Sequence, residues 1–304
     1  MKRVRNLIVV FVVVLALVIG GGVVLLARDR ARILIYPARN PVTTTPADMG
    51  IPNYEAVTFR SADGIDLQGW FLPPTSAADG AVIVYVHGLA SNRAGLLGQA
   101  VITHRVGYGA LLFDLRNHGE SGGTQTTLGF EEPRDVIAAV EYLKTRSDVN
   151  PARIVLAGES LGGATVLRAM SSLPDVVGVV AECAYSSIEE NIAEGVERIT
   201  GLPPFPFAPL IIFFGQQETG ARISDVRPID DVIRLAPRPV LFMHGDQDTL
   251  IDVSNSRRMF AAAGEPKQLV IFPGAIHGGL HQQDAALFTD SLLAFLDTYL
   301  PIAG

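Results

Sequence analysis

Short apolar segments that recur along the chain constrain its fold more than any other feature of the sequence. Each is about six residues long with little polar alternation, which is typical of strands buried on both faces of a parallel sheet. The segments are Ala81–Val86, Ala110–Leu115, Ile154–Ala157, Val176–Ala181, Val240–Met243 and Gln268–Phe272. Stretches of helical length lie between them: Ala94–His104, Pro133–Lys144, Leu161–Ser171, Ser254–Ala263 and Asp284–Leu300. This alternation predicts an α/β fold with a mostly parallel sheet covered by helices on both faces.

Two more strand-like segments precede this series. Tyr54–Arg60 and Ile65–Leu72 are rich in β-forming residues and are separated by Ser61-Ala62-Asp63-Gly64. An Asp-Gly pair between two such segments predicts a β-hairpin. We therefore expect one globular domain over residues 54–304.

The N-terminus carries an apolar segment of membrane-spanning length. Leu7–Ala27 gives 21 consecutive residues without a charged or strongly polar side chain, and a helix of that length spans roughly 30 Å. A cleaved signal peptide is the competing interpretation, because basic residues precede the segment. However, a signal core is usually about 7–15 residues long, and the charged segment Arg28–Arg32 follows here where an Ala-x-Ala site would stand. We expect residues 1–32 to form a retained single-pass membrane anchor, with basic flanks on both sides that leave its orientation open.

Charge and composition exclude several classes of partner. Residues 1–32 hold six basic residues and one acidic residue, so they contribute +5 to the net charge of −7 and leave −12 for residues 33–304. An acidic domain is a poor partner for nucleic acid. The lone Cys183 is expected to be a small buried side chain. The sequence has no paired cysteines, no H-E-x-x-H motif and no Gly-rich phosphate loop, so we expect no metal and no cofactor.

Two segments interrupt the alternation of strand-like and helical segments. Residues 33–53 contain four prolines and a run of threonines, which predicts an extended connector between the anchor and the domain. Residues 185–228 include the proline-rich, apolar passage Leu202–Phe214. We expect this second segment to be a cap inserted over the edge of the sheet, either as a fixed cover or as a mobile lid with an apolar inner face.

A serine motif lies where a strand is expected to turn into a helix. Gly158-Glu159-Ser160-Leu161-Gly162 follows the segment Ile154–Ala157 and opens a helical stretch, as the G-x-S-x-G motif requires. A sharp turn after a strand crowds the backbone, and residues without a Cβ relieve that crowding while the serine projects above the sheet. Ser160 is therefore the predicted nucleophile.

A serine nucleophile needs a base within hydrogen-bond reach and an acid that orients the base. His277 lies in the loop after the last apolar segment, and Asp246, Asp248 and Asp252 follow the segment before it. The carboxyl ends of parallel strands meet at one edge of the sheet, so these residues are expected to gather near Ser160. His277 is the predicted base. His87 is expected to shape the loop after the third strand, and His118 to be a plain loop histidine or to line the pocket.

The order of serine, acid and histidine along the chain resembles that of the α/β-hydrolase superfamily. The resemblance extends from Tyr54 to the C-terminus and includes His87-Gly88-Leu89-Ala90 and the turn Phe113–Gly122, which is similar to the D-x-R-G-x-G-x-S turn of the family. It selects Asp248, the last residue of an H-G-x-x-D pattern, as the acid. It also implies that the backbone N–H groups of Leu89 and Leu161 form an oxyanion hole.

The resemblance implies a membrane-anchored serine hydrolase of the esterase or lysophospholipase-like branch, because His-Gly-Leu-Ala replaces the His-Gly-Gly-Gly of some lipases. The anchor and the apolar cap favour a small-molecule or lipid ester with an apolar acyl group as substrate. Thioester hydrolysis would use the same three residues. A serine peptidase of the prolyl oligopeptidase type is a further alternative, although the large propeller of those enzymes is absent. A non-catalytic homologue is disfavoured, because such proteins usually lose a residue of the triad.

Overall fold

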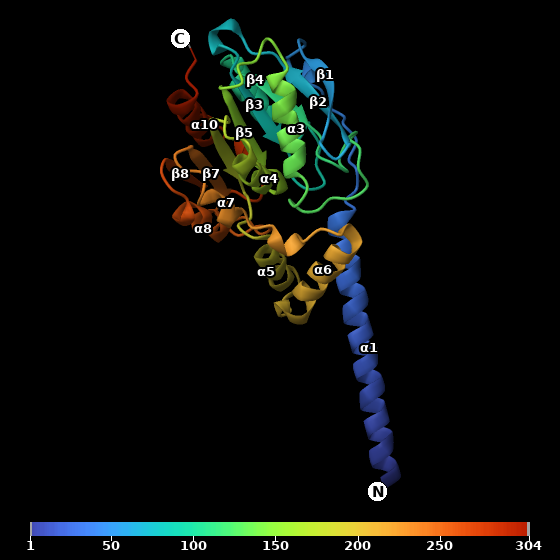
Figure 1. The fold of residues 1–304 in the computed structure, drawn as a ribbon. Coiled ribbons are helices and arrows are strands. Elements are labelled where there is room, and N and C mark those ends of the chain that lie inside the picture. Colours follow the sequence, from blue (N-terminus) through green and yellow to red (C-terminus); the bar gives the residue numbers. More distant parts are fainter. Residues whose placement is uncertain (1, 303–304) are drawn as a thin grey trace.

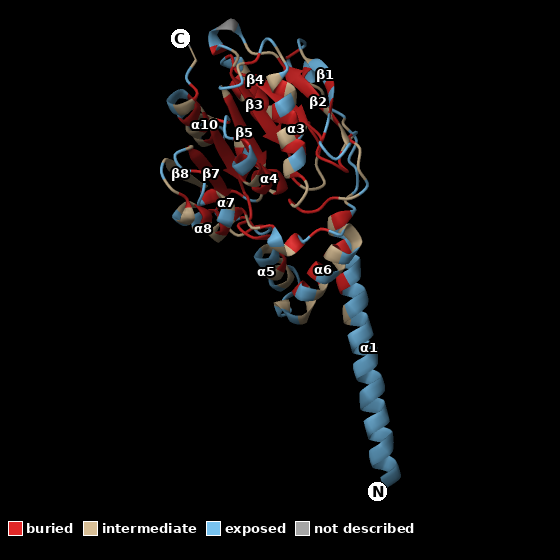
Figure 2. Cartoon of the chain, in the orientation of Figure 1, coloured by how far each residue is buried: buried red, intermediate tan, exposed pale blue. Residues whose placement is uncertain are grey.

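The computed structural model describes residues 2–302 as one long N-terminal helix followed by an α/β domain (Figure 1). Helix α1 spans Lys2–Ile35 and is long and apolar enough to cross a membrane, as many signal sequences also are. Most of its surface is exposed, but Ala27, Ala31 and Ile35 are buried at four-residue spacing (Figure 2). These three side chains lie on one face of the helix. The helix therefore continues through residues 33–35, where a connector was expected, because its last turns pack against the domain.

The sheet contains eight strands in the order β1-β2-β4-β3-β5-β6-β7-β8. The pairs β1–β2 and β2–β4 are antiparallel, and the pairs from β4 through β3, β5, β6 and β7 to β8 are parallel. The predicted hairpin and the predicted strands are confirmed, with ends that differ by two residues or fewer. The strands are β1 (Glu55–Arg60), β2 (Asp66–Leu72), β3 (Val82–Val86), β4 (Gly109–Phe113), β5 (Ile154–Glu159), β6 (Gly178–Glu182), β7 (Val240–Gly245) and β8 (Lys267–Phe272).

Helices cover both faces of the sheet, as the apolar character of the strands predicts. Side chains of α3, α4 and α8 share one buried cluster with one face of the sheet, and side chains of α2 and α10 share a second cluster with the other face. The cluster beneath α3 and α4 also includes Ala27 and Ala31 of α1. The helices are α2 (Leu97–Arg105), α3 (Pro133–Lys144), α4 (Leu161–Ala169), α7 (Pro228–Val232), α8 (Ser254–Ala262), α9 (Leu280–Gln283) and α10 (Ala285–Tyr299).

The proline-rich passage after β6 folds into two helices, α5 (Ile188–Thr200) and α6 (Pro204–Thr219), which lie beside the upper end of α1 (Figure 1). Ser187 caps α5 by accepting a hydrogen bond from the N–H of Glu190 at 3.4 Å. Pro204 stands at the first position of α6, where proline is tolerated because that N–H has no partner within the helix. Pro206 follows the non-helical Phe205, where the helix is kinked, and Pro209 lies inside the helix. The prolines that concealed this helix in the sequence therefore lie in its kinked N-terminal part.

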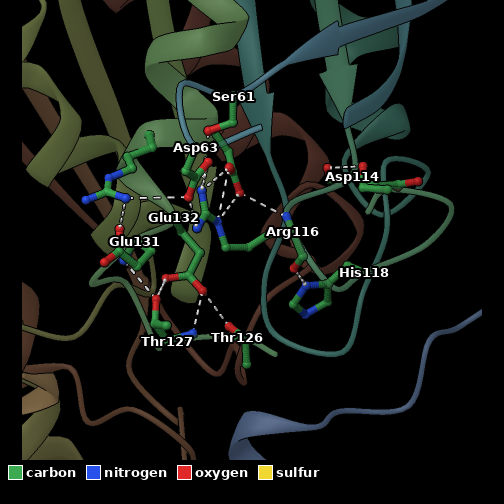
Figure 3. Close-up of polar contacts among 12 residues, drawn as sticks. Ser61, Asp63, Asp114, Arg116, His118, Thr126, Thr127, Glu131 and Glu132 are labelled. Carbon is green, nitrogen blue, oxygen red and sulfur yellow. Dashed lines mark hydrogen bonds and ion pairs between the residues drawn. The ribbon is translucent and has the colours of Figure 1, made fainter. Parts of the chain in front are cut away.

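A fully buried carboxylate, Glu132, organises the long loop between β4 and α3 (Figure 3). It accepts hydrogen bonds from the hydroxyl of Thr126 at 2.7 Å, from the N–H of Thr127 at 2.6 Å and from the N–H of Gly129 at 2.7 Å. Burial by itself would raise the pKa of Glu132, but the hydrogen bonds from Thr127 and Thr126 lower it below its ordinary value. A carboxylate bound by so many donors stays ionised and holds the loop in one conformation.

Glu132→Gln should destabilise the protein by about 1–3 kcal/mol near neutral pH, because an amide NH₂ would face donors and leave a buried group unsatisfied. The folded pKa of Glu132 is lowered, so its stabilisation is present above the unfolded value of about 4.3 and is lost as the pH falls through the folded value. Urea unfolding in detergent, near neutral pH and at about pH 3, measures the difference. Glu131→Gln is the matched control, because Glu131 forms a surface ion pair with Arg134 at 2.8 Å. A loss equal to that of Glu132→Gln would contradict the assigned role.

Candidate active site

Ser160 lies at the sharp turn between β5 and α4, with φ 58° and ψ −119°. A non-glycine residue with positive φ is strained, and the surrounding structure must hold it there. The neighbouring glycines make the turn possible: a Cβ on Gly162 would lie 1.9 Å from the carbonyl oxygen of Val86, and one on Gly158 would lie 2.4 Å from the carbonyl oxygen of Gly162. The local structure is thus the strand–turn–helix arrangement that the sequence predicted.

The structure brings Ser160, His277 and Asp248 into one hydrogen-bonded row. His277 Nε2 lies 3.0 Å from Ser160 Oγ, and His277 Nδ1 lies 2.7 Å from Asp248 Oδ2. The three residues follow β5, β8 and β7, so they meet at the carboxyl edge of the parallel sheet. An acceptor at Nδ1 favours the tautomer in which Nε2 is free to accept the serine proton.

Asp248 is held by several donors at once. Its Oδ1 accepts the N–H groups of Leu250 and Ile251, each at 2.8 Å, and its Oδ2 lies 3.1 Å from His244 Nε2 as well as close to His277. Burial would raise the pKa of Asp248, but hydrogen bonds from His244 and His277 lower it well below its ordinary value. The rival Asp246 is directed elsewhere, because its Oδ1 accepts the N–H of Gly274 at 2.7 Å.

The two amides assigned to an oxyanion hole flank Ser160. Leu161 is the first residue of α4, so its N–H has no acceptor within the helix. Leu89 lies in the loop that follows β3, and Gly88 of that loop approaches Ser160 so closely that a Cβ there would be 3.2 Å from Ser160 Cβ. Among residues 2–302, neither of the two N–H groups donates a hydrogen bond to another protein group. No acceptor within the described part of the chain therefore occupies either N–H group.

Two buried histidines brace the loop that carries Leu89. His118 Nε2 accepts the N–H of Ala90 at 3.2 Å while its Nδ1 lies 2.9 Å from the carbonyl oxygen of Arg116. His87 Nε2 accepts the N–H of Leu115 at 3.0 Å. Burial lowers the pKa of both rings, to about 3 for His87. Both histidines are therefore neutral acceptors that shape the loop, as expected for His87, while the contact between His118 and Ala90 has no signal in the sequence.

Charged pairs inside the turn after β4 explain its D-x-R pattern. Asp114 accepts the N–H of Arg93 at 2.6 Å and also pairs with the Arg93 guanidinium, which joins the loops after β3 and β4. Arg116 lies between Asp135, at 2.7 Å, and Asp63, at 2.8 Å (Figure 3). A buried ion pair with good geometry fixes the positions of the segments it joins more than it adds to the free energy of unfolding. These residues therefore hold the loops around the site and do not reach Ser160.

Glu159, directly before the nucleophile, contacts the histidine loop. Its Oε2 accepts the N–H of Gly279 at 2.8 Å, and a Cβ on Gly278 would lie 3.0 Å from its Oε1. Gly278 and Gly279 both have positive φ, which allows the loop after His277 to turn tightly around this carboxylate. Glu159 thereby ties the segment of the nucleophile to the segment of the base, a contact between residues too far apart in the sequence to be predicted.

One group of residues that could hold a metal ion, among those the structure describes, shares Asp248 and His277 with the hydrogen-bonded row. One ligand atom from each of Cys183, Asp248 and His277 lies within 4.8 Å of the others. However, Asp248 and His277 are bonded to each other, and burial raises the pKa of the Cys183 thiol far above its ordinary value. A protonated thiol is a poor metal ligand. The expectation that Cys183 is a buried side chain is confirmed.

Comparison with known proteins shows the family to which the chain belongs. The model of the prolyl oligopeptidase family matches residues 121–302. The uncharacterised protein Rv2307c of Mycobacterium tuberculosis is 31% identical over 97% of this chain and 96% of its own length. The α/β-hydrolase domain-containing protein WAV2 of Arabidopsis thaliana is 27% identical over 93% and 92%. Among solved structures, the esterase Pf2001 of Pyrococcus furiosus has a TM-score of 0.73 and 23% identity over 88% of this chain and 98% of its own. This structural likeness shows the α/β-hydrolase fold.

The crowding at the nucleophile turn predicts opposite effects for two Gly-to-Ala changes. Gly162→Ala should lower the free energy of unfolding by about 1–3 kcal/mol or more, because the new Cβ must displace the backbone of β3. A Cβ on Gly195, inside α5, would have no atom within 4 Å, so Gly195→Ala should gain about 0.5–1 kcal/mol from helix propensity. Denaturant unfolding of the full chain in detergent measures both. Equal effects would contradict the tight turn.

Proposed function

Because this chain belongs to the prolyl oligopeptidase family and has the α/β-hydrolase fold, we propose that it is a serine hydrolase of carboxylic esters with apolar acyl groups. The observation that carries the proposal is the hydrogen-bonded row of Ser160, His277 and Asp248, with distances of 3.0 and 2.7 Å. The free N–H groups of Leu89 and Leu161 supply the second requirement of acyl transfer, a site for the oxyanion.

Under this proposal, Ser160 Oγ attacks the acyl carbon while its proton passes to His277 Nε2. The negative oxygen that forms accepts hydrogen bonds from the amides of Leu89 and Leu161. His277 returns the proton to the leaving oxygen as the C–O bond breaks, which leaves the acyl group on Ser160. Water then attacks this acyl-enzyme and gives its proton to His277, and release of the acid restores Ser160. Asp248 holds the ring and stabilises its cationic form.

An ester is the favoured substrate, since the cap beside the site exposes large apolar side chains such as Phe205 and Phe213. The family name makes a peptide the second candidate. The family match begins at residue 121, however, and the described part before it folds into α1, a connector, the strands β1 to β4 and helix α2. Thioesters would react by the same steps. The relative turnover of an ester, a thioester and an amide of one acyl group separates these functions.

We propose further that α1 is retained as a membrane anchor. The N–H of Thr126 donates to the carbonyl oxygen of Ile35 at 2.9 Å, and Asn117 Nδ2 donates to the same oxygen at 3.3 Å. Ala27 and Ala31 are buried against the domain as well. A cleavage directly after the apolar segment would remove the buried Ala27 and leave Ala31 and Ile35 on a short helical stub, which favours an anchor over a cleaved signal peptide.

A fluorophosphonate probe should label the folded full chain, because it reacts with an activated serine. Ser160→Ala should abolish labelling, and His277→Ala should lower both labelling and ester turnover by several orders of magnitude. His104→Ala is the matched histidine control, since His104 Nδ1 lies 3.0 Å from the carbonyl oxygen of Tyr108 and outside the site. Probe gels and ester assays of the four proteins measure these outcomes. Labelling of Ser160→Ala equal to that of the unaltered chain would overturn the proposal.

Asp248→Asn should lower kcat by about 10³- to 10⁴-fold, because an amide can neither hold the required tautomer nor stabilise the imidazolium. Asp246→Asn provides the control from the same loop, since Asp246 binds the N–H of Gly274 and not His277. It should retain kcat within about a factor of three. Steady-state kinetics on a soluble ester gives both values. Comparable losses would mean that the acid has been assigned to the wrong residue.

A further inference from the structure

The end of α1 lies at the same edge of the sheet as the candidate active site. The carbonyl oxygen of Ile35 accepts hydrogen bonds from Asn117 and Thr126, both in the loop after β4. Asn40, in the connector, donates to the carbonyl oxygen of Ala90 in the loop after β3. These loops stand at the carboxyl ends of parallel strands, where Ser160 also lies. The site is therefore on the side of the domain from which the apolar helix extends.

A groove of about 300 Å³ is lined by residues of α1, α5 and α6. Its lining is largely apolar and includes Leu26, Ile33, Ile199, Leu202, Phe207 and Leu250. Leu250 lies at the end of the groove nearest the candidate active site, because its N–H donates to Asp248 Oδ1 at 2.8 Å. Arg198 of α5 fastens the same loop by donating to the carbonyl oxygen of Leu250 at 2.9 Å. The groove thus runs from the membrane helix to the loop of the proposed catalytic acid.

Large apolar side chains beside the outer end of the groove are exposed, and their contact with water is unfavourable. Ile199 and Phe205, at the turn between α5 and α6, have 72% and 76% of their surface exposed. The adjacent part of α1 is exposed and apolar on all sides, and the hairpin lies beside α1 (Figures 1 and 2). Two neighbouring apolar surfaces on one side of the domain are both covered if the hairpin tip enters the bilayer that α1 crosses.

Cationic side chains stand at the level where lipid headgroups would lie. Arg30 lines the groove, and Arg28 is half-exposed, with its guanidinium 3.8 Å from the carboxylate of Glu218 on α6. Arginine near the end of a spanning segment extends its charge toward the phosphate layer while its stem stays in apolar surroundings. The groove therefore has apolar walls that can contact an acyl chain and a positive charge that can pair with a lipid headgroup. These two features fit a membrane lipid better than a protein segment.

We propose that this groove binds the acyl chain of an ester lipid drawn from the bilayer, with the ester carbonyl directed toward Ser160. The inference rests on the proposed function and names its substrate class. Lipid would enter laterally between α1 and the hairpin, so the substrate need not leave the membrane before it reaches the site. The cap then acts as one wall of the acyl site and not merely as a cover.

Gly195 provides the test, because it lines the groove and its added Cβ would meet no atom within 4 Å. Gly195→Phe places a ring in the groove without displacing the core, and Gly195→Ala is the matched control. The full chain is assayed in phosphatidylcholine nanodiscs with p-nitrophenyl palmitate and p-nitrophenyl acetate, which share a leaving group. Gly195→Phe should lose at least about tenfold in palmitate turnover and keep acetate turnover, whereas Gly195→Ala should keep both.

Photocrosslinking gives an independent readout. A phosphatidylcholine with a diazirine in its acyl chain should label peptides of α1, α5 and α6 in the unaltered chain, and Gly195→Phe should lower that labelling. Unchanged palmitate turnover in Gly195→Phe overturns the inference, even if crosslinks remain, since the groove would then hold a lipid that is not the substrate. Absence of lipid crosslinks also overturns it and favours a protein partner. If the fluorophosphonate probe fails to label Ser160 in the unaltered chain, the proposed function itself fails. This result is distinguishable from unchanged palmitate turnover and from the absence of lipid crosslinks.

Discussion

Burial of both faces of β5 is the constraint on which the rest of the structure depends. This strand lies between β3 and β6 in the middle of the sheet, and its residues Ile154 to Ala157 are buried. After such a strand the chain turns out of the sheet and enters a helix. The turn must be tight, because β3 approaches it closely. The missing Cβ of Gly162 allows that approach. Ser160 is consequently raised above the edge of the sheet, and the neighbouring strands determine what surrounds it.

The loops around Ser160 carry many polar groups in places from which water is largely excluded, and each of these groups needs a partner. Asp114, Arg116, Glu132 and His118 meet that need within the loops after β3 and β4. The cost of an unsatisfied buried donor or acceptor makes each arrangement specific. The result is a hydrogen-bonded frame around the segments that carry Leu89 and Leu161, whose N–H groups have no acceptor among residues 2–302.

The apolar helix α1 and the candidate active site are joined through the same loops. Ala27 and Ala31 are small enough for α1 to pack closely on α6, and the connector then crosses the loops that frame Ser160. A domain held in this way presents the carboxyl edge of its sheet on the side from which the apolar helix extends. The position of the groove follows from this packing, since its walls come from α1 on one side and from the cap on the other.

The sequence by itself determined the eight strands, the helices that cover them, and Ser160 and His277 as candidates, because periodicity and the strand–turn–helix context are local properties. Resemblance to the hydrolase pattern favoured Asp248 over Asp246, two residues away, but only the fold shows which carboxylate faces His277. Helix α6 of the cap was concealed by Pro204, Pro206 and Pro209, which lie in a kinked N-terminal part that only the fold reveals. Contacts such as Glu159 with Gly279 join residues 120 positions apart. Tertiary structure alone decided these contacts, because a hydrogen bond requires two groups to meet in space and neither group carries a local signal of its partner.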